Sequence, residues 1–297
     1  MMSRRRFAQA SVFAMTGVSA LVRRTLANAA ENPLADLGAA FKAIEAEASG
    51  RLGVAILDTK SGASAGHRAN ERFPMCSTFK AVAAAAILAK VDAGKEQLTR
   101  RIAIKQSDIL SYAPIAKQHV DGEMSVAELC EAAITLSDNS AANILLRSLG
   151  GPAALTEYVR SLGDPLTRFD RFEPDLNEAT PGDPRDTSTP AAMAATLNRL
   201  ATGAALSPGS RDQWIAWLVA CKTSGARLRA GLPKTWRIGD KTGSGERGST
   251  NDVAIIWPEG RAPVIVAAFL TETAAPEEKR NAAHAAIGRA IAGAFGG

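Results

Sequence analysis

Two residues three positions apart, Ser77 and Lys80, are the first group in this sequence that could do covalent chemistry. They precede the Ala-rich run 81–91, a strong helix former, and follow Pro74, so we expect Ser77 at a helix N-terminus. Residues three apart share a helix face, and the free backbone N–H groups of a helix start favour an anion. A serine beside a lysine there is a candidate nucleophile with its proton acceptor. Read alone, the pair is more often a capping serine and a solvated lysine.

A second polar group, Ser137-Asp138-Asn139, lies between two predicted helices, 126–136 and 139–149. A hydroxyl and a carboxamide two residues apart in a tight connection can both point into one cleft. An ordinary helix cap is the simpler interpretation of this triplet by itself.

A third group, Glu173-Pro174-Asp175-Leu176-Asn177, lies in the segment 164–189, which contains four prolines and many charges. The glutamate and the asparagine four residues later could hold one water between them, as base and orienter. Arg171 and Asp186 bracket this group, and an ion pair between them would join the ends of a long ordered loop. Solvated loop charges are the alternative.

The fourth group, Lys241-Thr242-Gly243-Ser244-Gly245, follows at the end of a predicted strand, 236–241. A glycine lets the backbone lie close to a ligand, while the lysine and two hydroxyls can face an anion. The glycines of this region also match the dinucleotide-binding pattern G-x-G-x-x-G. A second strand, 252–257, follows in place of the helix that such a site requires, so we interpret the region as a hairpin.

Other catalytic patterns are missing from the sequence. There is no G-x-S-x-G elbow for a serine–histidine triad and no G-x-x-x-x-G-K-[ST] phosphate loop. The histidines lack the spacing of a zinc site: His67, His119 and His284. We therefore expect neither a metal nor a cofactor.

The net charge of +5 comes from the first 29 residues, which contain five arginines and no acid. Without them, 30 basic residues balance 30 acidic ones, so the charge does not indicate a nucleic-acid partner. A twin arginine in Ser3-Arg4-Arg5-Arg6-Phe7, a weakly apolar stretch and Ala27-Asn28-Ala29 predict a twin-arginine signal peptide over 1–29. The stretch is too short for a membrane span, and no later segment offers one. A cleaved, soluble, periplasmic protein is expected.

Helices are predicted at both ends of the remaining chain and throughout its middle, and strands only near the two ends. An α/β layer made from both termini, with a helical segment inserted, follows from this order. The predicted terminal elements are helices 34–48 and 276–294 and strands 51–58, 63–68, 236–241, 252–257 and 264–270.

As an ordered set, these motifs resemble the S-x-x-K, S-D-N and K-T-G signature of class A β-lactamases and penicillin-binding proteins. The resemblance runs from about residue 34 to the C-terminus, and 173–177 resembles the class A omega loop, which most transpeptidases lack. It implies an α/β (α+β) fold, an antiparallel five-stranded sheet flanked by helices with an inserted all-α subdomain. A single catalytic domain, 30–297, would combine an α/β subdomain, 30–68 plus 219–297, with an all-α subdomain, 69–218.

The resemblance implies four catalytic residues. Ser77 would be the acylated nucleophile, Lys80 a proton partner and Ser137 a relay to the leaving nitrogen. Glu173, with Asn177, would hold the hydrolytic water. A glutamate is normally ionised at neutral pH, whereas a lysine needs a large fall in pKa to act as a base. Deacylation is therefore assigned to Glu173, and the acylation base stays open.

The resemblance also implies a set of substrate-binding residues. Tyr112 would gate the cleft mouth, and Asn139 would bind the substrate's side-chain amide. Lys241, Thr242 and Ser244, with Arg227, would receive the substrate carboxylate. The backbone N–H groups of Ser77 and Ser244 would form an oxyanion hole. The set is Tyr112, Asn139, Asn177, Arg227, Lys241, Thr242, Gly243 and Ser244.

The sequence departs from some relatives after the K-T-G motif. Ser249-Thr250-Asn251 stand where many relatives carry a carboxylate-binding arginine, and Arg227 resembles the alternative arginine of others. Carbapenem-hydrolysing relatives pair the cysteine before the serine with one after K-T-G, where this chain has Gly245.

An odd number of cysteines allows at most one disulfide. Cys130 matches a disulfide cysteine of other members, but its partner position holds Ala84, so no family-type disulfide is predicted. Cys76 and Cys221 are the other two, and we interpret Cys76 as a buried, inert thiol.

The function implied is hydrolysis of the β-lactam amide bond of penicillins and cephalosporins by a monomer, giving antibiotic resistance. One rival is a peptidoglycan D-alanyl-D-alanine carboxypeptidase, which shares the acylation apparatus but deacylates antibiotic slowly. The other is a non-catalytic β-lactam-binding sensor. Glu173 distinguishes the β-lactamase from the carboxypeptidase, and steady turnover would distinguish it from the sensor. Ser244 is only compatible with broadened cephalosporin activity.

Overall fold

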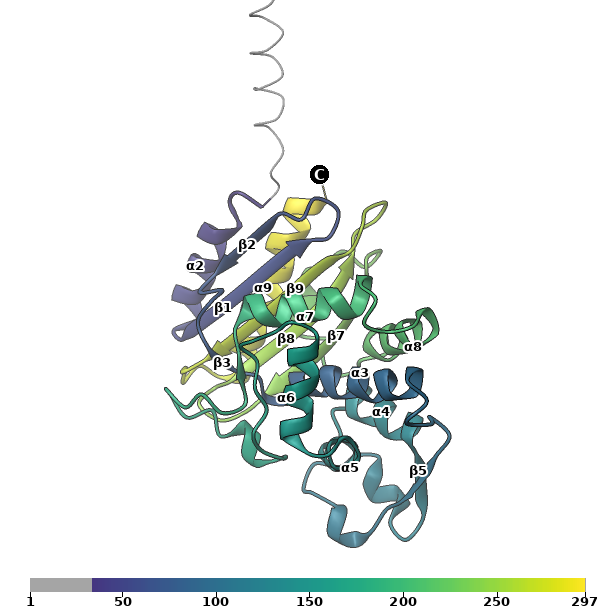
Figure 1. Ribbon diagram of the computed structural model, residues 1–297. Coiled ribbons are helices and arrows are strands. Elements are labelled where there is room, and N and C mark those ends of the chain that lie inside the picture. Colours follow the sequence, from purple (N-terminus) through teal and green to yellow (C-terminus); the bar gives the residue numbers. More distant parts are fainter. Residues whose placement is uncertain (1–33, 297) are drawn as a thin grey trace, which may run out of the picture. The chain divides into compact units, whose positions relative to one another are not determined.

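Five antiparallel strands form the central sheet of the computed structural model, which describes residues 34–296 (Figure 1). Strand β1 pairs with β9 along its whole length, from Arg51 opposite Thr271 to Asp58 opposite Val264. The predicted layer built from both ends of the chain is therefore confirmed, while the predicted signal peptide lies outside the described residues. In sheet order the strands are β2 (Ser64–His67), β1 (Arg51–Asp58), β9 (Val264–Thr271), β8 (Thr250–Trp257) and β7 (Arg237–Ser244).

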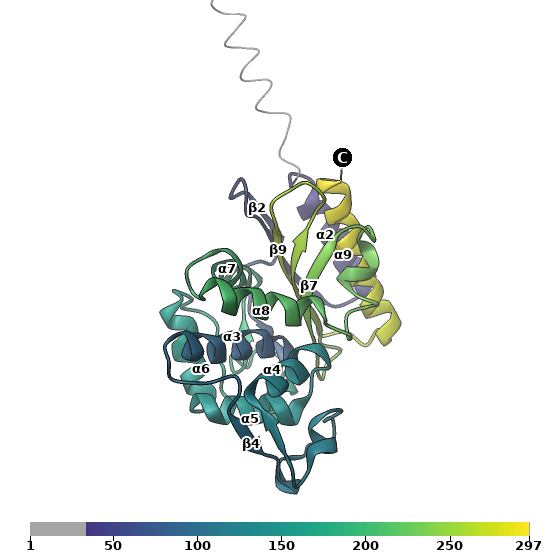
Figure 2. The same cartoon turned by 90° about the vertical axis from the view of Figure 1, so that its right-hand side faces the viewer.

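Strand β9 is buried at every position because helices cover both faces of the sheet. Its alternate residues enter different cores, Ile265 and Phe269 one and Val266 the other. Figure 1 shows α7 in front of the sheet, and Figure 2 shows α2 and α9 on its opposite side. The covering helices are α2 (Leu37–Ala48) and α9 (Glu277–Phe295) on one face and α7 (Pro190–Thr202) and α8 (Pro208–Val219) on the other.

Helix α3 (Phe79–Asp92) is the centre of the helical part of the molecule. Its first ten residues are all buried, and its alanines let neighbouring helices approach closely. Trp214 of α8 packs against it and donates its indole N–H to Ala81 O at 2.9 Å. The helices around α3 are α4 (Val126–Thr135), α5 (Asn139–Leu149), α6 (Pro152–Ser161) and α8.

The resemblance implied an all-α middle segment. This segment is mainly helical, but it also contains two small two-stranded sheets. Strands this short show no alternating pattern in sequence. One of them joins the end of the long loop to the residues just before Ser77. The pairs are β3 (Phe73–Pro74) with β6 (Thr187–Ser188) and β4 (Arg101–Ala103) with β5 (Glu123–Ser125).

Short 3₁₀ helices connect the larger elements, and none was predicted. They are η1 (Cys76–Thr78), η2 (Gln106–Asp108), η3 (Ala116–His119), η4 (Asp175–Asn177) and η5 (Leu228–Gly231). Within residues 34–296, no helix has the length and apolar character needed to cross a membrane.

Candidate active site

Ser77 lies in η1, which leads directly into α3, so the predicted position at a helix N-terminus is confirmed. Cys76 adopts a φ of 47°, in the left-handed region that non-glycine residues rarely occupy. The side chain of Asn251 donates to Pro74 O at 2.8 Å and to Met75 O at 3.0 Å. Strand β8 therefore fixes the backbone that presents the serine.

The hydroxyl of Ser77 donates to Glu173 Oε1 over 2.9 Å. Lys80 Nζ lies 3.0 Å from the same oxygen, and both side chains of this ion pair are inaccessible to solvent. Burial lowers the pKa of Lys80, while the carboxylate of Glu173 acts in the opposite direction. The serine, lysine and glutamate predicted from separate parts of the chain thus meet at one carboxylate oxygen.

Ser137 lies between two lysines. Its hydroxyl accepts from Lys80 Nζ at 3.3 Å and from Lys241 Nζ at 3.0 Å. Asn139 Oδ1 accepts from Lys80 Nζ at 2.6 Å, and Asp138 caps α5 by accepting from Ala141 N at 2.9 Å. Both interpretations of the triplet are therefore correct: the aspartate caps the helix, and its neighbours line the cleft.

Lys241 is fully buried, and burial, followed by the positive charge of Lys80, lowers its pKa to about 7. Its ammonium donates to Thr242 O at 2.8 Å as well as to Ser137. Strand β7 extends to Ser244, beyond the predicted end at residue 241, so Lys241 to Ser244 lie in regular strand geometry. A group with this pKa is poised between its two protonation states near neutral pH.

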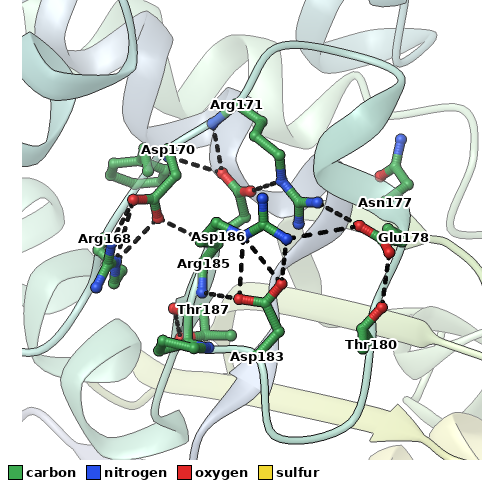
Figure 3. Close-up of polar contacts among 12 residues, drawn as sticks. Arg168, Asp170, Arg171, Asn177, Glu178, Thr180, Asp183, Arg185, Asp186 and Thr187 are labelled. Carbon is green, nitrogen blue, oxygen red and sulfur yellow. Dashed lines mark hydrogen bonds and ion pairs between the residues drawn. The ribbon is translucent and has the colours of Figure 1, made fainter.

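The loop that carries Glu173 is closed at its neck by an ion pair (Figure 3). Arg171 Nε lies 2.6 Å from Asp186 Oδ2, as predicted from the bracketing charges. Asp186 Oδ1 also accepts from the backbone N–H groups of Asp170 and Arg171, at 2.8 and 3.0 Å. Strand β6 follows at once and pairs with β3, which fixes the loop relative to Ser77.

Asn143 holds the backbone of Glu173 from both sides, donating to its carbonyl at 2.8 Å and accepting from its N–H at 2.9 Å. Asn177 Nδ2 donates to Glu173 Oε2 at 2.5 Å. Asn177 Oδ1 is buried and accepts no hydrogen bond from residues 34–296. Asn143 was not predicted as a site residue, although it stands four residues after Asn139 on the same helix face.

Arg227 is 6% exposed and makes four hydrogen bonds. Its guanidinium donates to Gly243 O, Asn251 O, Ser244 Oγ and Asn281 Oδ1 at 2.8, 2.7, 2.7 and 3.1 Å. Burial lowers its pKa, against the carboxylates of Asp252 and Glu277. One of its five N–H groups remains for a ligand.

A cleft of about 360 Å³ opens in front of these groups, and Lys80, Glu173 and Lys241 are not among the residues that line it. Tyr112, 49% exposed, is part of its rim. A second cavity, of about 330 Å³, lies under the loop 164–189 and contains no predicted site residue. The cleft is lined by Ser77, Tyr112, Ser137, Asn139, Asn177, Thr223, Arg227, Thr242, Gly243, Ser244 and Glu277.

Two lining residues, Thr223 and Glu277, were not predicted. Thr223 Oγ1 lies 2.5 Å from Thr242 Oγ1 and 3.3 Å from Cys221 Sγ. Thr223 lies in a loop and Glu277 begins α9, and neither belongs to a motif that sequence alone would reveal.

All three cysteines are free and buried. Burial raises the pKa of Cys76 to about 12, which supports its interpretation as an inert thiol. A Cβ at Gly245 would lie 2.6 Å from Cys76 Sγ, so the backbone there approaches closely. Among the residues that the structure describes, no group of three or more His, Cys, Asp or Glu could hold a metal ion.

Comparisons with known proteins agree with this geometry. A model of the β-lactamase enzyme family matches residues 36–295. The chain is 48% identical to β-lactamase Toho-1 of Escherichia coli over 86% of this chain and 88% of that protein. It is 45% identical to β-lactamase L2 of Stenotrophomonas maltophilia over 97% and 98% of the two chains. A solved ancestral class A β-lactamase superposes with a TM-score of 0.87 at 59% identity, covering 87% of this chain and all of that one.

These matches extend over nearly the whole described chain and include its sheet and helical parts alike. The chain therefore belongs to the β-lactamase enzyme family, as a class A serine enzyme that hydrolyses β-lactams and confers antibiotic resistance.

Proposed function

We propose that Ser77 is the acylated nucleophile and that Glu173 is the base of this hydrolysis. The observation that carries the proposal is the 2.9 Å hydrogen bond from Ser77 Oγ to Glu173 Oε1. As Oγ attacks the β-lactam carbonyl carbon, its proton passes to the carboxylate that already accepts it. Lys80 Nζ contacts Glu173, Ser137 and Asn139 and makes no hydrogen bond to Ser77 Oγ, so the geometry supports Glu173 as the acylation base.

Ser137 is the proposed donor to the leaving nitrogen. The β-lactam C–N bond breaks as the ester forms, and the nitrogen takes the proton of the Ser137 hydroxyl. Lys80 and Lys241 both contact that hydroxyl, at 3.3 and 3.0 Å, and the Lys80 ammonium can restore its proton. The neutral Lys80 amine then takes the proton that Glu173 accepted, over 3.0 Å, which returns the carboxylate to its ionised form for deacylation. The arrangement supplies an acid that is a different residue from the base, Glu173.

Deacylation requires a water activated beside the ester. A water between Glu173 and Asn177 would donate to the carboxylate and to the free Asn177 Oδ1 acceptor. Its oxygen attacks the ester carbon, and Ser77 Oγ leaves with a proton. Backbone N–H groups of Ser77 and Ser244 would stabilise the oxyanion, an effect worth about 10²–10³ in rate per donor.

The lining residues support separate substrate subsites. Asn139 would bind the side-chain amide, because its oxygen already accepts from Lys80 and its Nδ2 is left for the ligand. Thr242, Ser244 and Arg227 would receive the substrate carboxylate, with Lys241 behind them. Gly243 allows close packing of β7 on η1, since a Cβ there would lie 2.8 Å from Met75 O. Tyr112 would gate the mouth.

Turnover of nitrocefin by the purified mature protein tests this function. We expect steady multiple turnover, because Glu173 makes deacylation fast. A single stoichiometric burst would instead support a β-lactam-binding sensor. Slow release with faster cleavage of a D-alanyl-D-alanine peptide would support a carboxypeptidase.

We also propose that residues 1–29 are a twin-arginine signal peptide and that the mature protein is a periplasmic monomer. The five arginines, the absence of acids and the Ala27-Asn28-Ala29 site support this reading. Replacing Arg4 and Arg5 by lysine should block export. An exported mass that still includes residues 1–29 would contradict the cleavage. We further propose that the mature chain consists of two subdomains, one formed by residues 30–68 and 219–297 and the other by residues 69–218.

A further inference from the structure

Glu277 is the acidic residue of the cleft. It is the first residue of α9 and is exposed to solvent. Asn281 stands four residues further along the same helix face and accepts from Arg227 Nε at 3.1 Å. Glu277 therefore lies on the side of α9 that faces Arg227, in agreement with its place in the cleft lining.

The two charged residues of the cleft wall differ in how accessible they are to a ligand. Of its lining residues, only Arg227 and Glu277 carry a charge. The guanidinium of Arg227 is buried and engaged by four protein acceptors, whereas Glu277 has no ion-pair partner among residues 34–296. A ligand group that extends past the carboxylate subsite therefore meets a negative charge.

The chemistry of cephalosporins places a substituent at that point. Their carboxylate is attached to the ring carbon next to C3, so the C3 group lies beside the carboxylate. With the carboxylate on Thr242, Ser244 and Arg227, a location that rests on the proposed function, the C3 group extends along this wall. We propose that Glu277 is a specificity-determining residue that favours cephalosporins with a cationic C3 group over those with a neutral one.

A matched pair of substrates tests this proposal. Cephaloridine carries a pyridinium at C3 and cephalothin a neutral acetoxy group, while both share one acyl side chain. The quantity measured is the ratio of kcat/KM for the cationic substrate to that for the neutral one. An exposed ion pair contributes about 0.2–1 kcal/mol, so Glu277→Gln should lower this ratio by about 1.4- to 5-fold at low salt.

Glu278→Gln is the matched control. Glu278 also lies in the first turn of α9, so both variants lose one charge from the same helix terminus, but Glu278 does not line the cleft. Its ratio should equal that of the wild type. Glu277→Lys should lower the ratio more than Glu277→Gln does. Added salt should reduce the differences between the variants and the wild type.

An unchanged ratio in Glu277→Gln, or an equal fall in Glu278→Gln, would overturn the inference. Either result alongside normal turnover of both substrates by the wild type would leave the proposed function intact. Failure of the wild type to turn over either substrate would instead contradict the proposed function itself.

Discussion

The buried ammonium of Lys241 should reduce the stability of the folded protein, and Lys241→Met should recover part of that loss. Burial lowers the lysine's pKa from 10.5 to about 7, a difference that corresponds to about 5 kcal/mol. The variant loses hydrogen bonds to Ser137 Oγ and Thr242 O, together worth about 2–3 kcal/mol. We therefore expect the variant to be about 1–3 kcal/mol more stable than the wild type at pH 6, although it binds substrate poorly.

The pH dependence of this difference gives the sharper test. Between pH 7 and 10.5 the unfolded chain binds more protons at residue 241 than the folded chain does, so wild-type stability rises with pH. The stability gained by Lys241→Met over the wild type should be fully present below about pH 7 and should shrink toward pH 10.5. Urea unfolding at several pH values measures it, with the exposed Lys222→Met as control. A variant no more stable than the wild type at pH 6, or a difference independent of pH, would contradict the lowered pKa of Lys241 and its effect on stability.

Three further predictions concern groups away from the cleft surface. Asn143→Ala should lower kcat by about 10–100-fold and make acyl-enzyme accumulate, because Glu173 loses both backbone anchors; unchanged deacylation would contradict this. Asp186→Ala should cost about 3 kcal/mol in urea unfolding, since Arg171 Nε and two backbone N–H groups lose their acceptor; a cost below about 0.5 kcal/mol would refute it. Burial lowers the pKa of His284 to about 3, so the unfolded chain binds more protons between pH 6.5 and 3. The wild type should lose up to about 5 kcal/mol across that window, and His284→Gln should lose less; equal losses would contradict the assignment.

Local geometry made part of the site predictable. Ser77 and Lys80 stand three residues apart before a helix-forming run, and the structure places both at the start of α3. The charges that bracket Glu173 predicted the ion pair between Arg171 and Asp186, which is present at 2.6 Å. Such features depend on a few neighbouring residues, so sequence spacing determines them.

The meeting of Ser77 with Glu173 could not be derived from local pattern. The two residues are 96 positions apart, and they meet because β6 pairs with β3 and Asn143 anchors the loop. Only the resemblance of the ordered motifs to a known family implied their contact. Tertiary packing of this kind leaves no periodic signal in either segment.

Long-range packing also explains the two residues of the cleft that sequence analysis missed. Thr223 reaches the cleft because its loop packs beside Thr242 of β7, and Glu277 because α9 packs on η5 near Arg227. The two- and three-residue strands of the middle segment escaped prediction for a related reason. Strands that short are defined by their partners and not by their own composition.

Glu173 is proposed to drive hydrolysis of the ester on Ser77. Glu173→Gln preserves the side chain's size but removes the base, and the exposed Asp175→Asn in the same turn is its control. Intact-mass measurement after mixing with a penicillin should show a stable adduct on Glu173→Gln and none that persists on the wild type or on Asp175→Asn. Wild-type turnover by Glu173→Gln without an accumulated adduct would contradict this role of Glu173.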